Sequence, residues 1–212
     1  MDATAIERVI RAQAGIHSST ILGWTIFAFL CGSLPIAVWL GRYALKTDIT
    51  QFGDGNPGAT NVYRATKSVP WYALALALEF SKAAVPVGLA YQIFGVQDWR
   101  IIPVALATTL GHMFSPFLRG RGGKALATVG GVWIAIHFLT LFLPLMVLTV
   151  LWSLVVKPSG WAVALTLASF ILYIVLRDFS TVILWLILAQ TPLILARQLP
   201  ELRHRPTLAW RS

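Results

Sequence analysis

The chain is poor in charged residues and in cysteine. Of its 212 residues, 12% are charged and 57% are apolar, and mean hydropathy is +0.73, whereas an ordinary soluble domain has about 25% charged residues. This scarcity of charge excludes a soluble domain and indicates an integral membrane protein. Cys31 is the single cysteine, so an internal disulfide is excluded as well.

Long apolar segments predict an all-α fold, a polytopic bundle of about seven transmembrane helices. A helix of about 20 residues crosses a bilayer, so little length remains for an additional soluble domain. Residues 125–156 are nearly uninterrupted, and one helix there would leave six spans; seven fit better, because that stretch exceeds the bilayer by roughly ten residues. The expected spans are residues 21–45, 69–93, 101–118, 125–141, 143–156, 161–176 and 180–196.

The distribution of positive charge predicts the orientation of these spans. If the amino terminus lies outside, most of the 17 Lys and Arg residues fall on the cytoplasmic side, together with the carboxyl terminus. This topology and anionic lipid explain the net charge of +9. Because no separate basic domain is present, we expect no nucleic-acid partner.

Three regions are expected along the chain. Residues 1–20 place Ile6, Val9 and Ile10 beside Arg8 and Arg11, a pattern that predicts an amphipathic segment lying on the membrane. Residues 21–198 form a single transmembrane domain. Residues 199–212 form a basic cytoplasmic tail.

A glycine-rich polar loop interrupts the apolar segments. Its glycines allow backbone N–H groups to converge on one anion, and the nearby amide, hydroxyl and guanidinium groups add donors. The loop satisfies G-x-G-x-x-G, but it lies between membrane spans instead of between a strand and a helix, so a dinucleotide site is not supported. The alternative is a flexible interfacial turn. The candidate phosphate-binding residues are Gly53, Gly55, Asn56, Gly58, Thr60, Asn61 and Arg64.

A second cationic cluster follows the third predicted span. Gly122 and Gly123 allow close backbone approach, and Lys124 supplies a mobile charge for phosphate. His112 is either a proton carrier or phosphate donor, or a structural histidine bonded to a neighbouring helix. Thr128 completes the cluster. The sequence does not match G-x-x-x-x-G-K-[ST], so a nucleotide P-loop is unsupported.

Polar residues also lie within the predicted spans. Ser33 interrupts the first span, and Arg42 follows it. Glu79 and Lys82 are spaced i, i+3, so their side chains can face one another. Ionisable residues inside a span are functional candidates; the alternative for this pair is a structural ion pair that fixes helix packing.

These residues carry a resemblance to the PlsY family of bacterial acyl-phosphate-dependent glycerol-3-phosphate acyltransferases, over residues 28–130. The motifs that resemble it are Gly32-Ser33-Leu34-Pro35, Gly53-Asp54-Gly55-Asn56-Pro57-Gly58-Ala59-Thr60-Asn61-Val62-Tyr63-Arg64, and Gly111-His112-Met113-Phe114 through Gly122-Gly123-Lys124-Ala125-Leu126-Ala127-Thr128. The resemblance implies about seven spans in the bacterial inner membrane, with the active site facing the cytoplasm. It implies acyl transfer from acyl phosphate to the 1-hydroxyl of glycerol 3-phosphate, yielding lysophosphatidic acid and phosphate for phospholipid synthesis.

The resemblance also implies roles for the site residues. Membrane lipid, acyl phosphate and glycerol 3-phosphate are the implied partners, with no metal and no cofactor, and the oligomeric state is left open. Glu79 and Lys82 are expected to contact the site residues and not the substrate. The implied catalytic residues are Ser33, Arg42, Asn61, His112 and Lys124, and the implied substrate-binding residues are Gly53, Gly55, Asn56, Gly58, Thr60, Arg64, Gly122, Gly123 and Thr128.

Three positions depart from the family pattern. Asp54 stands where the family usually has serine, and Glu79 stands in place of the aspartate of an Asp-x-x-Lys-Gly pattern. The family ends on an Arg-His-Arg-x-Asn-Ile type motif, where residues 197–202 read Arg-Gln-Leu-Pro-Glu-Leu; Glu201 would then face a phosphate, unless His204 substitutes. Two functions follow: an active acyltransferase with a diverged carboxyl terminus, or a paralogue that binds or transports lipids or phosphate esters.

Overall fold

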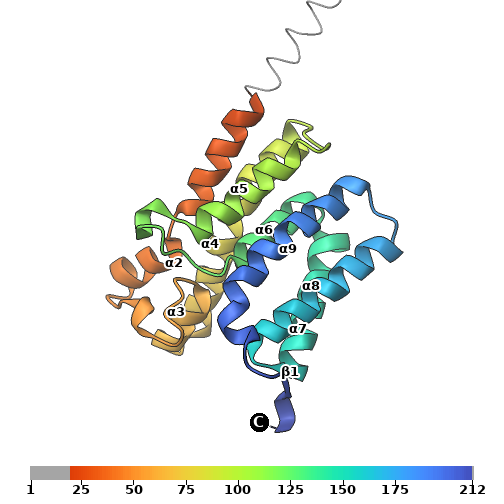
Figure 1. The fold of residues 1–212 in the computed structure, drawn as a ribbon. Coiled ribbons are helices and arrows are strands. Elements are labelled where there is room, and N and C mark those ends of the chain that lie inside the picture. Colours follow the sequence, from red (N-terminus) through yellow and green to blue (C-terminus); the bar gives the residue numbers. More distant parts are fainter. Residues whose placement is uncertain (1–19, 212) are drawn as a thin grey trace, which may run out of the picture.

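The computed structural model describes residues 20–211 and is helical through most of this range (Figure 1). The amphipathic segment expected at residues 1–20 therefore lies, except for its last residue, outside the described residues. The helices are residues 20–33, α2 (Ile36–Trp39), α3 (Ala59–Thr66), α4 (Val69–Gly88), α5 (Ile101–Met113), α6 (Leu126–Ile136), α7 (Leu143–Val155), α8 (Ser159–Leu176) and α9 (Thr181–Leu202). Two short strands, β1 (Val156–Lys157) and β2 (Thr207–Leu208), pair antiparallel.

Six helices in the described part of the chain are long and apolar enough to cross a membrane, and α6 is a shorter apolar helix. Some of these spans include π-helical turns, which extend α2 and α4 and precede α7 at Leu40–Ala44, Leu89–Ile93 and Phe138–Phe142. The spans are Thr20–Ala44, Val69–Ile93, Ile101–Leu118, Phe138–Val155, Ser159–Leu176 and Thr181–Leu202. The predicted all-α membrane class is confirmed.

The predicted boundary between the spans 125–141 and 143–156 is wrong. The chain breaks earlier, at His137, whose backbone is extended (φ −155°, ψ 105°). The side-chain amide of Gln92 donates to the carbonyls of Ala135 and Ile136 at 3.0 and 2.9 Å, so the last carbonyl groups of α6 are satisfied there. The final span is also longer than expected, since α9 continues through Pro200 to Leu202.

The first span is broken where the sequence predicts an interruption. Its first helix ends at Ser33, and α2 begins after Pro35, which has no N–H to donate. A broken helix inside a membrane needs partners for the freed backbone groups. Lys82 Nζ donates to Leu34 O at 3.1 Å, and Glu79 Oε1 accepts the Ala37 N–H at 3.2 Å. The Glu79–Lys82 ion pair on α4 therefore supplies hydrogen-bond partners for the backbone groups that are freed at the break in the first span.

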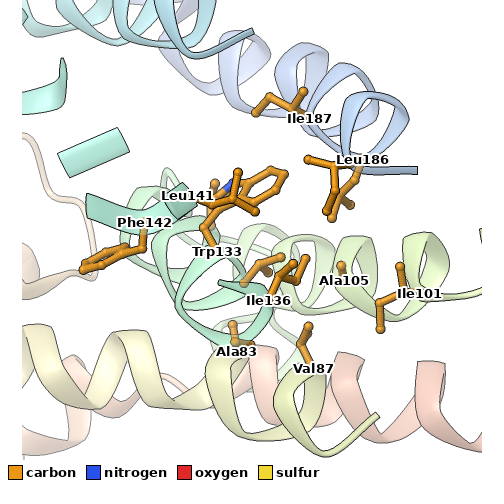
Figure 2. Packing of buried hydrophobic residues seen from close by; sticks show 14 of the residues in the cluster. Ala83, Val87, Ile101, Ala105, Trp133, Ile136, Leu141, Phe142, Leu186 and Ile187 are labelled. Atoms are coloured by element: carbon orange, nitrogen blue, oxygen red, sulfur yellow. The ribbon is translucent and has the colours of Figure 1, made fainter. Parts of the chain in front are cut away.

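The core lies where α4, α5, α6 and α9 meet. Figure 2 shows Trp133 and Ile136 of α6 between the side chains of α4 and α5 on one side and those of α9 on the other. The Trp133 ring contacts Phe170 of α8 edge to face, with centroids 5.3 Å apart. A Cβ at Gly131 would overlap the carbonyl of Phe80, so this glycine lets α6 approach α4 closely.

Candidate active site

An amphiphilic cavity joins the two glycine-rich loops to the interior of the helix bundle. It has a volume of about 440 Å³, within the range of roughly 300–1,000 Å³ typical of small-molecule sites. Its polar lining includes Asp54, Asn56, Thr60, Arg64, His112, Lys124 and Ser159. Its apolar lining includes Leu76 and Phe80 of α4, Val129 of α6, Leu145 and Met146 of α7, Leu167 of α8 and Ile194 of α9.

Asn61 organises the loop over residues 53–61. Its side chain is 1% exposed; Nδ2 donates to Asn56 O at 2.9 Å and Oδ1 accepts from Arg64 Nη1 at 2.9 Å. Gly53 and Gly55 have φ values of +60° and +71°, which other residues rarely adopt. These three residues shape the loop, and none of them lines the cavity.

The loop is not the open cradle of amides that the sequence predicts. The N–H groups of Gly55, Asn56 and Gly58 are already bonded within the loop. The open donors are instead at the start of α3, whose N-cap Gly58 has no side chain to bond them. Ala59 and Thr60 of this first turn line the cavity, and the unpaired N–H groups and partial positive charge of a helix N-terminus favour an anion.

Lys124 lies at the polar end of the cavity between two carboxylates. Its Nζ is 3.0 Å from Asp54 Oδ2 and also bonds Glu201 Oε1, while its backbone N–H donates to Asn56 Oδ1 at 3.0 Å. Asp54 pairs in addition with Arg64 at 3.1 Å. The two predicted phosphate-binding loops are therefore brought together, as the sequence predicts, but with two acidic residues between them.

The charge pairs at this end shift the pKa values of their members. Partial burial raises the pKa of Asp54, but the hydrogen bond and charge of Lys124 outweigh it, and the pKa lies below its ordinary value. Burial lowers the pKa of Lys124, but Glu201 and Asp54 outweigh it, and the pKa lies above its ordinary value. The stabilisation from Asp54 is lost as pH falls through its folded pKa, and that from Lys124 as pH rises through its own. Both groups are charged at neutral pH.

Gly122 and Gly123 have a packing role that differs from the predicted one. Their N–H groups donate to the carbonyls of Met113 and His112, each at 3.2 Å, so these amides are not open to a phosphate. A Cβ at Gly122 would overlap His112 O, and one at Gly123 would overlap the His112 ring. The two glycines let the loop that carries Lys124 lie against the end of α5.

Glu79, Lys82 and His112 form a buried cluster behind the cavity. Lys82 Nζ is 2.7 Å from Glu79 Oε2 and 2.6 Å from His112 Nδ1. Because an ammonium group only donates, His112 Nδ1 is the acceptor, which leaves the ring proton on Nε2. Glu79 and His112 line the cavity, and Lys82 does not. The Glu79–Lys82 pair is therefore a buried ion pair in contact with His112, and a functional role for it stays a prediction.

Ser33, Thr128 and Arg42 also do not line the cavity, in addition to the loop and cluster residues described above. Ser33 is buried, and its hydroxyl donates to Phe29 O at 2.7 Å within its own helix. Thr128 is fully buried in α6, and Arg42 is exposed on the π-helical turn after α2. Any contact of these side chains with a substrate stays a prediction.

The sequence reasoning missed the contribution of the last helices. Gln198 of α9 and Ser159 of α8 line the polar part of the cavity, and Ser153 of α7 lines it as well. Glu201, expected to repel a phosphate, instead bonds Ser159 Oγ and accepts the Gly160 N–H at 2.7 Å. The only sequence signal was small polar residues in apolar segments, and such residues are also common at ordinary helix contacts.

Comparison with known proteins gives consistent matches. The family model described as glycerol-3-phosphate acyltransferase matches residues 22–207. A glycerol-3-phosphate acyltransferase of Photorhabdus laumondii is 42% identical over 120 residues, which are 56% of this chain and 54% of that protein. One from Enterococcus faecalis is 36% identical over 153 residues, 69% of each chain. The match thus spans about half the length of the first of these relatives.

Two crystal structures of PlsY, an integral membrane glycerol 3-phosphate acyltransferase, have the same fold. The glycerol 3-phosphate form aligns with a TM-score of 0.76 at 27% identity and covers 85% of this chain and 89% of that one. The lysophosphatidic acid form aligns with a TM-score of 0.73 at 28% identity and covers 84% and 87%.

Proposed function

The chain belongs to the glycerol-3-phosphate acyltransferase family, and from this premise we propose that it transfers a fatty acyl group from acyl phosphate to the 1-hydroxyl of glycerol 3-phosphate. The products are lysophosphatidic acid and inorganic phosphate, and the step belongs to phospholipid synthesis. The supporting observation is the amphiphilic cavity. Its polar end offers Lys124, Arg64 and the start of α3 to phosphate groups, and its apolar lining suits an acyl chain.

The residues that line the cavity suit a reaction in which the protein mainly holds the two substrates in position and stabilises their negative charge. The glycerol hydroxyl oxygen attacks the acyl carbonyl carbon, the bond from that carbon to the phosphate oxygen breaks, and the departing phosphate takes the hydroxyl proton. Lys124 and Arg64 stabilise negative charge on the phosphates, and His112 presents Nε2–H as a further donor. We propose no metal and no organic cofactor for this step.

The membrane setting completes the proposal. We propose that the cavity opens at the cytoplasmic surface of a bacterial inner membrane, and the positive charge of the loops supports this orientation. Both phosphate-bearing groups then approach from water or from the headgroup region, while the acyl chain reaches the cavity from the lipid.

A coupled release assay tests this function. Purified protein in detergent or lipid is given palmitoyl phosphate, and release of inorganic phosphate is measured with and without glycerol 3-phosphate. We expect release only when glycerol 3-phosphate is present, together with formation of lysophosphatidic acid. Binding of either substrate without coupled release would favour the alternative, a paralogue that binds or transports lipids or phosphate esters. That alternative is favoured by one observation, the neutralisation of Lys124 by Asp54 and Glu201.

We also propose a different position for the carboxyl-terminal motif. Residues 203–208 read Arg-His-Arg-Pro-Thr-Leu, which fits the Arg-His-Arg-x-Asn-Ile pattern with Thr207 in place of asparagine. The family match reaches residue 207, and α9 ends at Leu202, so this segment follows the last span. Residues 197–202, the position expected from the sequence, are helical instead. His204 is exposed and follows closely after Glu201, whose side chain bonds Lys124 at the polar end of the cavity; the His204 backbone N–H donates to the Glu201 carbonyl at 3.2 Å.

Replacing His204 tests this position. We expect His204→Gln to lower coupled phosphate release by about tenfold or more, since a lost donor to developing charge commonly costs at least that much. His137→Gln is the matched control, because His137 is exposed like His204 but lies at the end of α6, outside the proposed motif. Equal rates of coupled phosphate release in the two variants would contradict the proposed position of the motif and favour residues 197–202.

A further inference from the structure

At the polar end of the cavity, carboxylates of the protein itself balance the positive charge of its two cationic side chains. Lys124 is bonded by Asp54 at 3.0 Å and by Glu201, and Arg64 is bonded by Asp54 at 3.1 Å. These are two cations and two carboxylates. The site proposed to take a phosphate dianion therefore presents no net positive side-chain charge before the substrate arrives.

Both carboxylates are fixed by donors other than Lys124. Asp54 Oδ1 accepts from Asn61 Nδ2 and from the Asn56 N–H, each at 3.3 Å. These bonds tie Asp54 to the loop before α3.

Glu201 is held by a different element, the start of α8. Its Oε2 accepts from Gly160 N at 2.7 Å and from Ser159 Oγ, at the start of α8. Lys124, in contrast, carries its ammonium on a flexible four-carbon stem, and its Nζ bonds only these two carboxylates among the contacts of the described residues. The Lys124 ammonium therefore has fewer bonds to fix its position than either carboxylate has.

An incoming phosphate consequently meets attraction and repulsion at the same place. It gains contact with Lys124 and Arg64, but it must share or displace the carboxylates already bonded to them, and like charges a few ångströms apart repel. Acyl phosphate has a second hold on the protein, because its chain contacts the apolar lining of the cavity. Orthophosphate has no such hold.

We infer that Asp54 and Glu201 compete with phosphate for Lys124 and so select against free orthophosphate, leaving the acyl chain to determine which phosphate occupies the site. The inference rests on the proposed function for its biological sense. Orthophosphate, the product, is expelled after transfer and does not block the site.

The test is the affinity of the purified full chain for inorganic phosphate. We expect Asp54→Asn and Glu201→Gln each to tighten orthophosphate binding by about three- to tenfold, and the double variant by more, measured by calorimetry and as product inhibition of coupled release. Asp98→Asn is the matched control: the Asp98 side chain is 45% exposed against 40% for Asp54, it pairs with Arg100, and it does not line the cavity. Its orthophosphate affinity is expected to equal that of the unmodified chain.

Asp54→Glu separates charge from loop shape, because it keeps the carboxylate and is expected to bind orthophosphate as weakly as the unmodified chain. Unchanged or weaker orthophosphate binding in both neutral variants would overturn the inference, and so would tighter binding in Asp54→Glu. The two proposals fail separately. If the chain releases phosphate in the coupled assay but the neutral variants bind orthophosphate no more tightly, only the inferred competition for Lys124 is contradicted. If the neutral variants bind orthophosphate more tightly but no coupled release occurs, only the proposed acyltransferase activity is contradicted.

Discussion

Replacing Lys124 by methionine is expected to lower coupled phosphate release by about a hundredfold or more. Lys124 and Arg64 are the Lys and Arg side chains that line the cavity in the described part of the chain, and removing one preorganised donor to developing charge commonly costs 10²- to 10³-fold in rate. Methionine keeps the length of the aliphatic stem, so the loss reports on the charge. Release of phosphate from palmitoyl phosphate in the presence of glycerol 3-phosphate measures it.

A second variant distinguishes loss of the cation from exposure of its acidic partners. Lys124→Met leaves Asp54 and Glu201 facing one another without the ammonium between them, and their repulsion could itself lower the rate. The triple variant Lys124→Met, Asp54→Asn, Glu201→Gln removes that repulsion. We expect it to stay as slow as Lys124→Met; recovery of turnover would contradict a direct role of the lysine. Lys46→Met, an exposed lysine away from the cavity, is expected to retain full activity.

Glu79→Ala is expected to lower the free energy of unfolding by about 3–5 kcal/mol, because it leaves the Lys82 ammonium buried without its counter-charge. Glu79 and Lys82 side chains are each 1% exposed and 2.7 Å apart. The substitution also removes the acceptor for the Ala37 N–H at the break in the first span. Unfolding in detergent by titration with sodium dodecyl sulfate measures the change.

Two comparisons make this stability test specific. The double variant Glu79→Leu, Lys82→Leu removes both buried charges and is expected to recover a large part of the lost stability, since well-packed apolar residues often replace a buried pair without loss. Asp98→Ala breaks a partly exposed pair with Arg100, whose side chains are 45% and 30% exposed, and is expected to have a much smaller effect. A Glu79→Ala variant as stable as Asp98→Ala would show that the buried cluster does not hold the helix break.

Some residues that line the cavity, among them Arg64, His112 and Lys124, could be predicted from the sequence, but the position of the others often could not. Polar residues in apolar spans stood out at Ser33, Glu79 and Lys82 because charge and hydroxyl groups are costly there. The sequence could not show that Lys82 and Glu79 bond the backbone on either side of Pro35, because that contact joins residues more than 40 positions apart. Likewise, the glycines at 122 and 123 signalled close approach, but to His112 and not to a ligand.

By itself the sequence determined the membrane class, the approximate spans and the two glycine-rich loops, because hydropathy and the conformational needs of glycine are local properties. Tertiary structure alone decided the break at His137, where Gln92 from another helix bonds the free carbonyls. It also decided how Asp54 and Glu201 are bonded; they are distant in the sequence, which predicts only that both repel phosphate. Folding brings both to Lys124, and an electrostatic interaction depends on distance in space, which the order of residues does not specify.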